Sequence, residues 1–277
     1  MALIQVNFMS KALMRTVPVN VILPVDKAWE DSPAESKPFK TLYLLHGMLG
    51  NYTDWVSGTC IQRWAEEKDL AVVMPSGDNM FYVDQKKSHN YYGYFIGREL
   101  VEITRRMFPL SRKREDTFIA GLSMGGYGAV RNGLKYHDVF GCAAGLSAAL
   151  ITGDDLSSRP NDTTDIFASR DFVESIFGDL SKVKESDMNP EWLVKELTKK
   201  GVELPKIYLA CGVDDFLLEQ NRRARDYMLE AGVDLTYEEG PGAHEWDFWN
   251  RHIKKVIDWL PLDKNAAAGK NSGNIGK

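Results

Sequence analysis

The chain has 277 residues, of which 44% are hydrophobic and 26% are charged, and its formal net charge is −5. This length allows one large α/β domain or two small ones with a substantial core. The net negative charge argues against a nucleic-acid-binding surface, so we expect no nucleic-acid partner.

No stretch approaches the roughly 18 uncharged apolar residues that a membrane-spanning helix needs. The apolar run near the start, residues 2–4, is too short for the core of a signal peptide. We therefore expect no membrane association and a cytoplasmic location. The three cysteines, Cys60, Cys142 and Cys211, cannot all pair and lack a metal-type spacing, so no metal site is expected. Cys142 and Cys211 lie in apolar runs typical of buried thiols.

Two β-rich segments, 3–9 and 17–23, open the chain and predict an antiparallel pair at a sheet edge. A polar loop at 27–37 follows. Strands are then expected at 42–45, 71–74, 118–122, 139–146, 207–211 and 235–238, and helices at 61–68, 96–108, 216–231 and 245–260. This alternation predicts an α/β fold with a mainly parallel central sheet and helices on both faces.

Residues 147–195 interrupt the alternation and are rich in Ser, Asp, Asn and Thr. Because so long a segment between two strands is usually functional or a local excursion, we interpret it as a cap-like insertion over the carboxyl edge of the sheet. The insertion belongs to a single domain expected over residues 1–263. The tail, 264–277, is rich in Ala, Gly, Asn and Lys and is expected to be disordered.

The most informative motif is Gly121-Leu-Ser-Met-Gly125, a G-x-S-x-G pattern directly after an expected strand. A serine on such a strand-to-helix turn projects its hydroxyl from the end of the sheet. The following helix offers free N–H groups and a positive dipole end near Ser123. A glycine-rich turn that happens to contain serine is an equal alternative, so the assignment of Ser123 as a nucleophile depends on its partners.

A serine nucleophile needs a base, and the chain has only five histidines. His244 lies in a turn between the last strand and the last helix, where its imidazole can reach the carboxyl end of the sheet. His46 follows a central strand and is interpreted as a structural residue of its loop. The other three, His89, His137 and His252, are interpreted as surface or packing residues.

The acid that orients the base should lie between Ser123 and His244 in the chain. Asp214 and Asp215 both end the penultimate strand, and either could instead cap the helix expected from residue 216. We favour Asp215 as the triad member and Asp214 as a cap or a solvated neighbour.

An oxyanion hole requires two N–H donors aimed at the developing charge. One is expected from the backbone of Met124, directly after the nucleophile. The second is expected from the backbone of Met48, in the sharp loop after the strand at 42–45.

Aromatic residues near the expected carboxyl edge suggest an apolar substrate pocket. The alternative is that they only pack loops. The candidates are Trp55, Tyr91 and Tyr92, with Phe81, Tyr82 and Tyr94 beside them in the sequence.

Four ordered motifs together resemble the α/β-hydrolase fold and, within it, the putative esterase family. They are Leu42-Tyr-Leu-Leu-His-Gly-Met48, residues 120–129, Cys211-Gly-Val-Asp-Asp-Phe-Leu217 and Gly242-Ala-His-Glu-Trp246, and the resemblance runs from about residue 1 to 262. It is strongest to the small bacterial tributyrin (acetyl) esterases. Val213-Asp214 departs from the Thr-Glu expected in relatives, which leaves the acidic position of Asp215 intact.

The resemblance implies a Ser123–His244–Asp215 triad, a small-molecule ester substrate with a short acyl chain, and no metal or organic cofactor. The expected function is therefore a serine carboxylesterase that works through an acyl-enzyme. S-formylglutathione hydrolase and feruloyl or acetyl-saccharide esterase are the alternatives, and a non-catalytic binding module on the same fold is a remote one. A homo-oligomer is left open, because no pattern marks a dimer interface.

Overall fold

The computed structural model describes residues 1–26, 37–151, 153–161, 164 and 169–263. The expected disordered tail and most of the polar loop at 27–37 lie outside the described residues.

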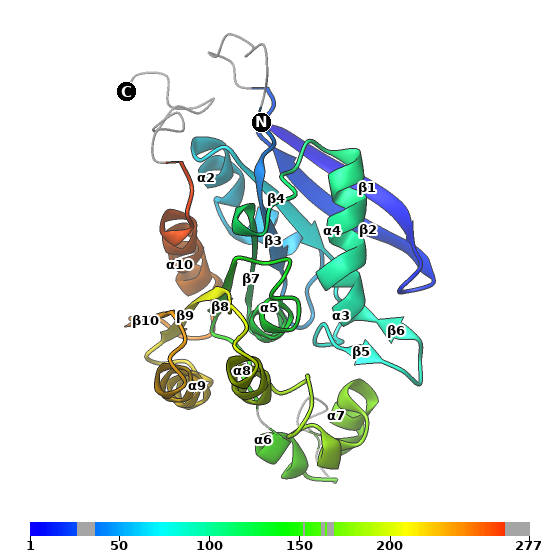
Figure 1. Ribbon diagram of the computed structural model, residues 1–277, viewed down its shortest axis with the longest axis vertical. Coiled ribbons are helices and arrows are strands. Elements are labelled where there is room, and N and C mark those ends of the chain that lie inside the picture. Colours follow the sequence, from blue (N-terminus) through cyan, green and yellow to red (C-terminus); the bar gives the residue numbers. More distant parts are fainter. Residues whose placement is uncertain (27–36, 152, 162–163, 165–168, 264–277) are drawn as a thin grey trace.

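The core of the structure is an eight-stranded sheet in the order β1-β2-β4-β3-β7-β8-β9-β10 (Figure 1). The strands β3 to β10 of this sheet run parallel, and β1 and β2 form an antiparallel hairpin whose β2 pairs antiparallel with β4. The sequence prediction of a mainly parallel sheet with an antiparallel N-terminal edge is confirmed. The strands are β1 Ala2–Ser10, β2 Arg15–Leu23, β3 Lys40–Leu45, β4 Leu70–Pro75, β7 Thr117–Leu122, β8 Cys142–Leu146, β9 Lys206–Gly212 and β10 Leu235–Gly240.

Helices cover both faces of the sheet because the central strands are apolar on both sides. In β3, Tyr43 and Leu45 join one core cluster, and Leu42 and Leu44 join the other. The first face is covered by η1 Phe95–Glu99, α4 Leu100–Met107, α5 Met124–Lys135, α8 Pro190–Lys199 and α9 Leu218–Glu230. The second is covered by α1 Asp54–Gly58, α2 Ile61–Glu67 and α10 Trp246–Trp259.

Several boundaries differ from the sequence prediction. The helix expected from residue 96 begins earlier, because α3 Tyr92–Tyr94 and the π-helical turn η1 lead directly into α4. A short hairpin, β5 Asp84–Gln85 with β6 Asn90–Tyr91, precedes it, and a 3₁₀ turn, η2 Arg114–Asp116, precedes β7. The helix expected from residue 216 begins at Leu218, since Asp215 and the residues after it form a turn.

In its described residues, the segment between β8 and β9 holds four short helical elements: α6 Gly153–Ser157, α7 Arg170–Phe177, η4 Leu180–Lys182 and α8. It is tethered to the sheet through the buried side chain of Arg131 on α5. This guanidinium donates to the backbone and the carboxylate of Asp187 at 2.9 and 2.8 Å. The ring of Phe177 on α7 also packs against Phe81 and Tyr127. These contacts hold the segment against α5, and α8 lies next to that helix (Figure 1).

Cys142 and Cys211 are buried free thiols, as expected from their apolar surroundings. Among the described residues, no helix combines the length and the apolar character needed to cross a bilayer. Over the same residues, no cluster of His, Cys, Asp and Glu has the makings of a metal site.

Candidate active site

Ser123 lies on the tight turn between β7 and α5, with φ 52° and ψ −120°. A non-glycine residue in this region is strained by about 1–3 kcal/mol, and such strain concentrates at functional sites. The turn is held by the Ser123 N–H, which donates to Leu146 O at 2.9 Å. It also requires glycine at position 125, because a Cβ there would lie 2.5 Å from the carbonyl oxygens of Leu45 and His46.

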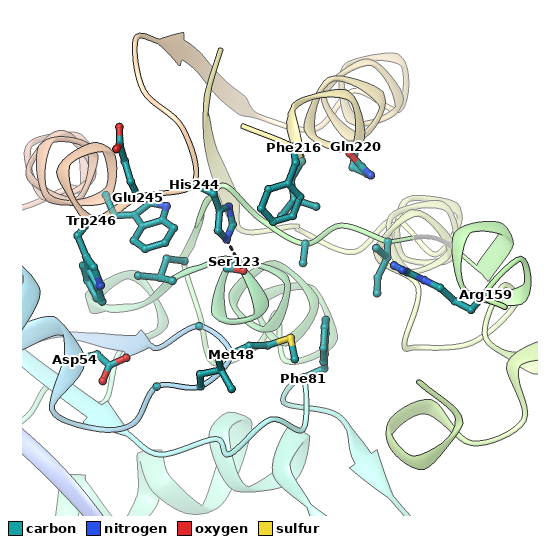
Figure 2. Close-up of a pocket in the computed structure, with 18 residues that line it drawn as sticks. Met48, Asp54, Phe81, Ser123, Arg159, Phe216, Gln220, His244, Glu245 and Trp246 are labelled. Atoms are coloured by element: carbon teal, nitrogen blue, oxygen red, sulfur yellow. Dashed lines mark hydrogen bonds between the residues drawn. The ribbon is translucent and has the colours of Figure 1, made fainter. Parts of the chain in front are cut away.

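His244 joins Ser123 to Asp215 through hydrogen bonds on both ring nitrogens. Figure 2 shows the bond between His244 and Ser123. Nδ1 lies 3.0 Å from Asp215 Oδ2, and Nε2 lies 3.0 Å from Ser123 Oγ. Because an ionised carboxylate can only accept, Nδ1 carries the proton in the neutral ring, and Nε2 is left to accept the serine proton. The structure thus brings together the three residues expected from the sequence, in the order of a base between a nucleophile and an acid.

The Asp215 side chain is fully buried. Burial alone would raise its pKa, but hydrogen bonds from His244, the Leu217 N–H and Ser147 outweigh this and lower the pKa below its usual value. The Leu217 N–H donates to Oδ1 at 2.9 Å. Asp215 is therefore held as the anion, whereas Asp214 is exposed to solvent. This difference agrees with the preference for Asp215.

Ser147 and Trp249 contact Asp215 and His244, and the sequence analysis missed both. Ser147 is buried, has φ 45°, and accepts a hydrogen bond from Trp249 Nε1 at 3.0 Å. The ring of Trp249 also lies edge-on to His244, with centroids 5.0 Å apart. Ser147 directly follows β8 at the carboxyl edge, which was the one signal that pointed to it.

His46 shapes the loop that carries Met48. The Gly77 N–H donates to Nε2 at 2.8 Å, so Nδ1 carries the proton and donates to Gly47 O at 2.6 Å. Burial lowers the pKa of this imidazole, which favours the neutral ring that both bonds require. His46 therefore occupies the structural position expected for it.

The two amides expected to form the oxyanion hole belong to residues beside Ser123. Met124 is the first residue of α5, and the first N–H groups of a helix have no acceptor within it. Met48 lines the same pocket as Ser123 (Figure 2).

A pocket of about 980 Å³ opens over Ser123 and His244. Apolar side chains make up much of its wall, with a few charged and polar groups among them. The lining side chains beyond those already discussed include Leu49, Asp54, Phe81, Ile151, Arg159, Phe216, Leu217, Gln220, Glu245 and Trp246.

The prediction that Trp55, Tyr91 and Tyr92 line this pocket is wrong. Trp55 is buried in the second core cluster, where Nε1 donates to Leu45 O at 2.9 Å. The buried Tyr92 directs its hydroxyl to Arg15 and Asp78. Tyr91 is half-buried, and its N–H donates to Ala12 O at 3.2 Å, beside the β1–β2 hairpin.

Of the six aromatic candidates, only Phe81 lines the pocket formed by the described residues. Two further aromatic residues of the pocket wall, Phe216 and Trp246, belong to the sequence motifs that carry Asp215 and His244. Their place in these motifs was a sequence signal that could have identified them.

The chain matches the family described as putative esterase over residues 10–260. The chain belongs to the putative esterase family. The acetyl esterase of Caldicellulosiruptor saccharolyticus is 44% identical over 262 residues, which are 94% of this chain and 98% of that relative.

Solved structures of this esterase's relatives agree with the family assignment. FphF, a fluorophosphonate-binding serine hydrolase of Staphylococcus aureus, has a TM-score of 0.82 at 36% identity, covering 95% of this chain and 99% of that one. The S-formylglutathione hydrolase FrmB from Staphylococcus aureus has a TM-score of 0.80 at 36% identity, covering 94% and 98%. A ferulic acid esterase has a TM-score of 0.74 at 23% identity, covering 94% and 97%, which shows a shared fold.

These comparisons confirm the α/β-hydrolase fold and the expected family. The protein is an enzyme, a hydrolase of the carboxylesterase class.

Proposed function

We propose that this esterase hydrolyses short-chain acyl esters, of the acetyl or butyryl type, through an acyl-enzyme on Ser123. The observation that carries the proposal is the continuous hydrogen-bonded chain from Ser123 Oγ through His244 to Asp215. The short acyl group is supported by the 44% identity to an acetyl esterase.

In the first half of the reaction, Ser123 Oγ attacks the ester carbonyl carbon while His244 Nε2 takes its proton. The carbonyl oxygen becomes an oxyanion, and the N–H groups of Met48 and Met124 donate to it. Asp215 keeps the ring oriented and stabilises the imidazolium. The imidazolium then gives its proton to the leaving alcohol oxygen as the bond from carbon to that oxygen breaks.

In the second half, water replaces the alcohol. His244 takes a proton from the water as its oxygen attacks the acyl carbon, and then returns that proton to Ser123 Oγ as the acid leaves. The steps require no group beyond these residues, the ester and water.

All three cysteines are unpaired, and we propose the cytoplasm, which keeps thiols reduced, as the location.

Hydrolysis of p-nitrophenyl esters from acetate to decanoate, with wild type beside Ser123→Ala, tests this function. We expect the highest kcat/KM at acetate or butyrate and its loss in Ser123→Ala. Activity kept by Ser123→Ala would overturn the nucleophile, and a maximum at decanoate would overturn the short acyl chain.

A thioesterase of the S-formylglutathione hydrolase type is the second candidate, because FrmB is 36% identical over nearly the whole chain. The same groups would act on a thioester, with a thiol as the leaving group. A kcat/KM for S-formylglutathione far above that for p-nitrophenyl acetate would favour this candidate over the ester. The ferulic acid esterase is 23% identical and supports only the fold, so feruloyl ester hydrolysis is not proposed.

A further inference from the structure

The pocket differs in chemistry on the two sides of Ser123 (Figure 2). Asp54 and Trp246 lie on one side, and Arg159 and Gln220 lie on the other. Arg159 follows α6 in the segment between β8 and β9, and Gln220 belongs to α9. The part of the pocket lined by Arg159 and Gln220 is called the polar arm below.

Arg159 brings a positive charge to the polar arm, and among the described residues no acidic group pairs with it. Its Nε is buried and has no hydrogen-bond partner among the described residues. Over the same residues, no carboxylate lies within ion-pair distance of its guanidinium, whereas Arg170 in the same segment and Arg223 on α9 pair with Glu174 and Asp155. A buried N–H group without an acceptor is unfavourable, and carboxylate is the group that the fork of N–H donors of a guanidinium fits best.

Gln220 adds a second unsatisfied group to the same arm. Its Oε1 is buried and lacks a hydrogen-bond partner among the residues that the structure describes. Most buried side-chain polar atoms in proteins have a partner, so two exceptions in one arm of a pocket point to a ligand. Gln220 Oε1 accepts, and so it suits an N–H or O–H group of that ligand.

The size of the pocket leaves room for such a ligand. Its volume of about 980 Å³ is at the upper end of the range for sites that hold drug-sized molecules. An acetyl or butyryl group on Ser123 fills only a small part of this space. The remainder of the substrate therefore extends away from the reacting carbonyl.

We infer that the polar arm is a subsite for a carboxylate carried by the substrate, with Arg159 binding the anion and Gln220 accepting from a neighbouring donor. The inference rests on the proposed function, because it places the reacting ester at Ser123. The carboxylate belongs either to the acyl chain or to the alcohol, and matched substrates separate these two sources.

For the acyl chain, the pair is p-nitrophenyl valerate and mono-p-nitrophenyl glutarate, which share a five-carbon acyl chain and differ in the terminal carboxylate. For the alcohol, the pair is 4-propylphenyl acetate and 3-(4-acetoxyphenyl)propionate. The variants are Arg159→Met, Arg159→Lys and Gln220→Glu. Arg170→Met is the matched control, because it removes a positive charge from the same segment outside the pocket.

In Arg159→Met we expect kcat/KM to fall about ten-fold or more for the carboxylate member of one pair, because a charged hydrogen bond is lost. For the neutral member of each pair, kcat/KM should stay at the wild-type value. Arg159→Lys should recover part of the loss, and Gln220→Glu should repel the same substrate. Arg170→Met should change neither member. Equal effects of Arg159→Met on charged and neutral esters, or no effect on either pair, would overturn the subsite.

A binding measurement keeps this test separate from the test of the proposed function. Calorimetry measures the binding of monomethyl glutarate and of 3-(4-hydroxyphenyl)propionate to two proteins. One is the Ser123→Ala variant, and the other is the double variant that carries Ser123→Ala and Arg159→Met. Weaker binding of either acid to the double variant supports the subsite even if the wild type hydrolyses none of the esters. Equal binding of both acids to the two proteins contradicts it, even if short esters are hydrolysed through Ser123.

Discussion

The ring of Phe216 lies against the imidazole of His244, with their centroids 4.6 Å apart. Phe216 directly follows Asp215, so one turn after β9 supplies both the carboxylate on Nδ1 and an aromatic ring against the face of the base. Phe216 is nevertheless 73% exposed, because its outer face forms part of the pocket wall.

Phe216→Ala should raise KM for p-nitrophenyl butyrate while leaving the free energy of unfolding nearly unchanged. The ring contributes apolar surface to the pocket but is too exposed to contribute much to the core. Steady-state kinetics and urea denaturation measure the two effects. Leu229→Ala is the control, since Leu229 is an exposed residue of α9 that does not line the pocket. Equal KM values for the two variants would contradict a role for Phe216 in binding.

Asp215→Asn should lower kcat by about 10⁴, because the amide stabilises the wrong tautomer of the base and leaves the imidazolium without its anion. Asp214→Asn is the matched control, one residue away and exposed. It should leave kcat at the wild-type value. A larger loss in Asp214→Asn than in Asp215→Asn would reverse the assignment of the acid.

His46→Phe should reduce both stability and turnover. It leaves the Gly77 N–H and the Gly47 carbonyl without their partner, at a cost of about 1–3 kcal/mol for each buried group. If the Met48 amide moves with this loop, kcat should fall by about 10²–10³ with a smaller change in KM. Thermal unfolding and steady-state kinetics measure the two effects, with the exposed His89→Phe as control. Unchanged kcat in a folded His46→Phe protein would show that the loop does not position a donor.

His252 should make the protein sensitive to mild acid. Burial against Phe248, with a smaller contribution from Lys255, lowers its pKa from 6.5 to about 4, although Glu238 opposes the shift from 4.0 Å. Between pH 6.5 and 4, the His252 imidazole is therefore protonated in the unfolded chain and neutral in the folded protein. The stability from the neutral ring is complete above pH 6.5 and is lost as pH falls through this window.

Between pH 7 and pH 5 the free energy of unfolding should fall by about 2 kcal/mol on account of His252. His252→Leu should remove this part of the pH dependence, as measured by urea denaturation at both pH values. If the free energy of unfolding falls equally between pH 7 and pH 5 in wild type and in His252→Leu, the acid sensitivity comes from other groups.

The candidate triad could be predicted because its residues follow strands of one parallel sheet. The carboxyl ends of β7 and β9 meet at the same edge, and the turn after β10 returns there, so chain order was enough to bring Ser123, Asp215 and His244 together. The aromatic pocket residues could not be predicted in the same way. Trp55 and Phe216 both lie beside this edge, but the direction of each ring depends on the conformation of its loop.

The sequence by itself determined the alternation of strands and helices, the antiparallel edge and the motifs around the nucleophile. Apolar periodicity and glycine positions are local properties of the chain, so they predict strands, helices and turns without knowledge of any distant contact. Only the tertiary structure decided that Ser147 supports Asp215, that Tyr92 turns toward Arg15, and that Arg159 enters the pocket. Each of these depends on how helices and loops far apart in the chain pack together, which no local pattern records.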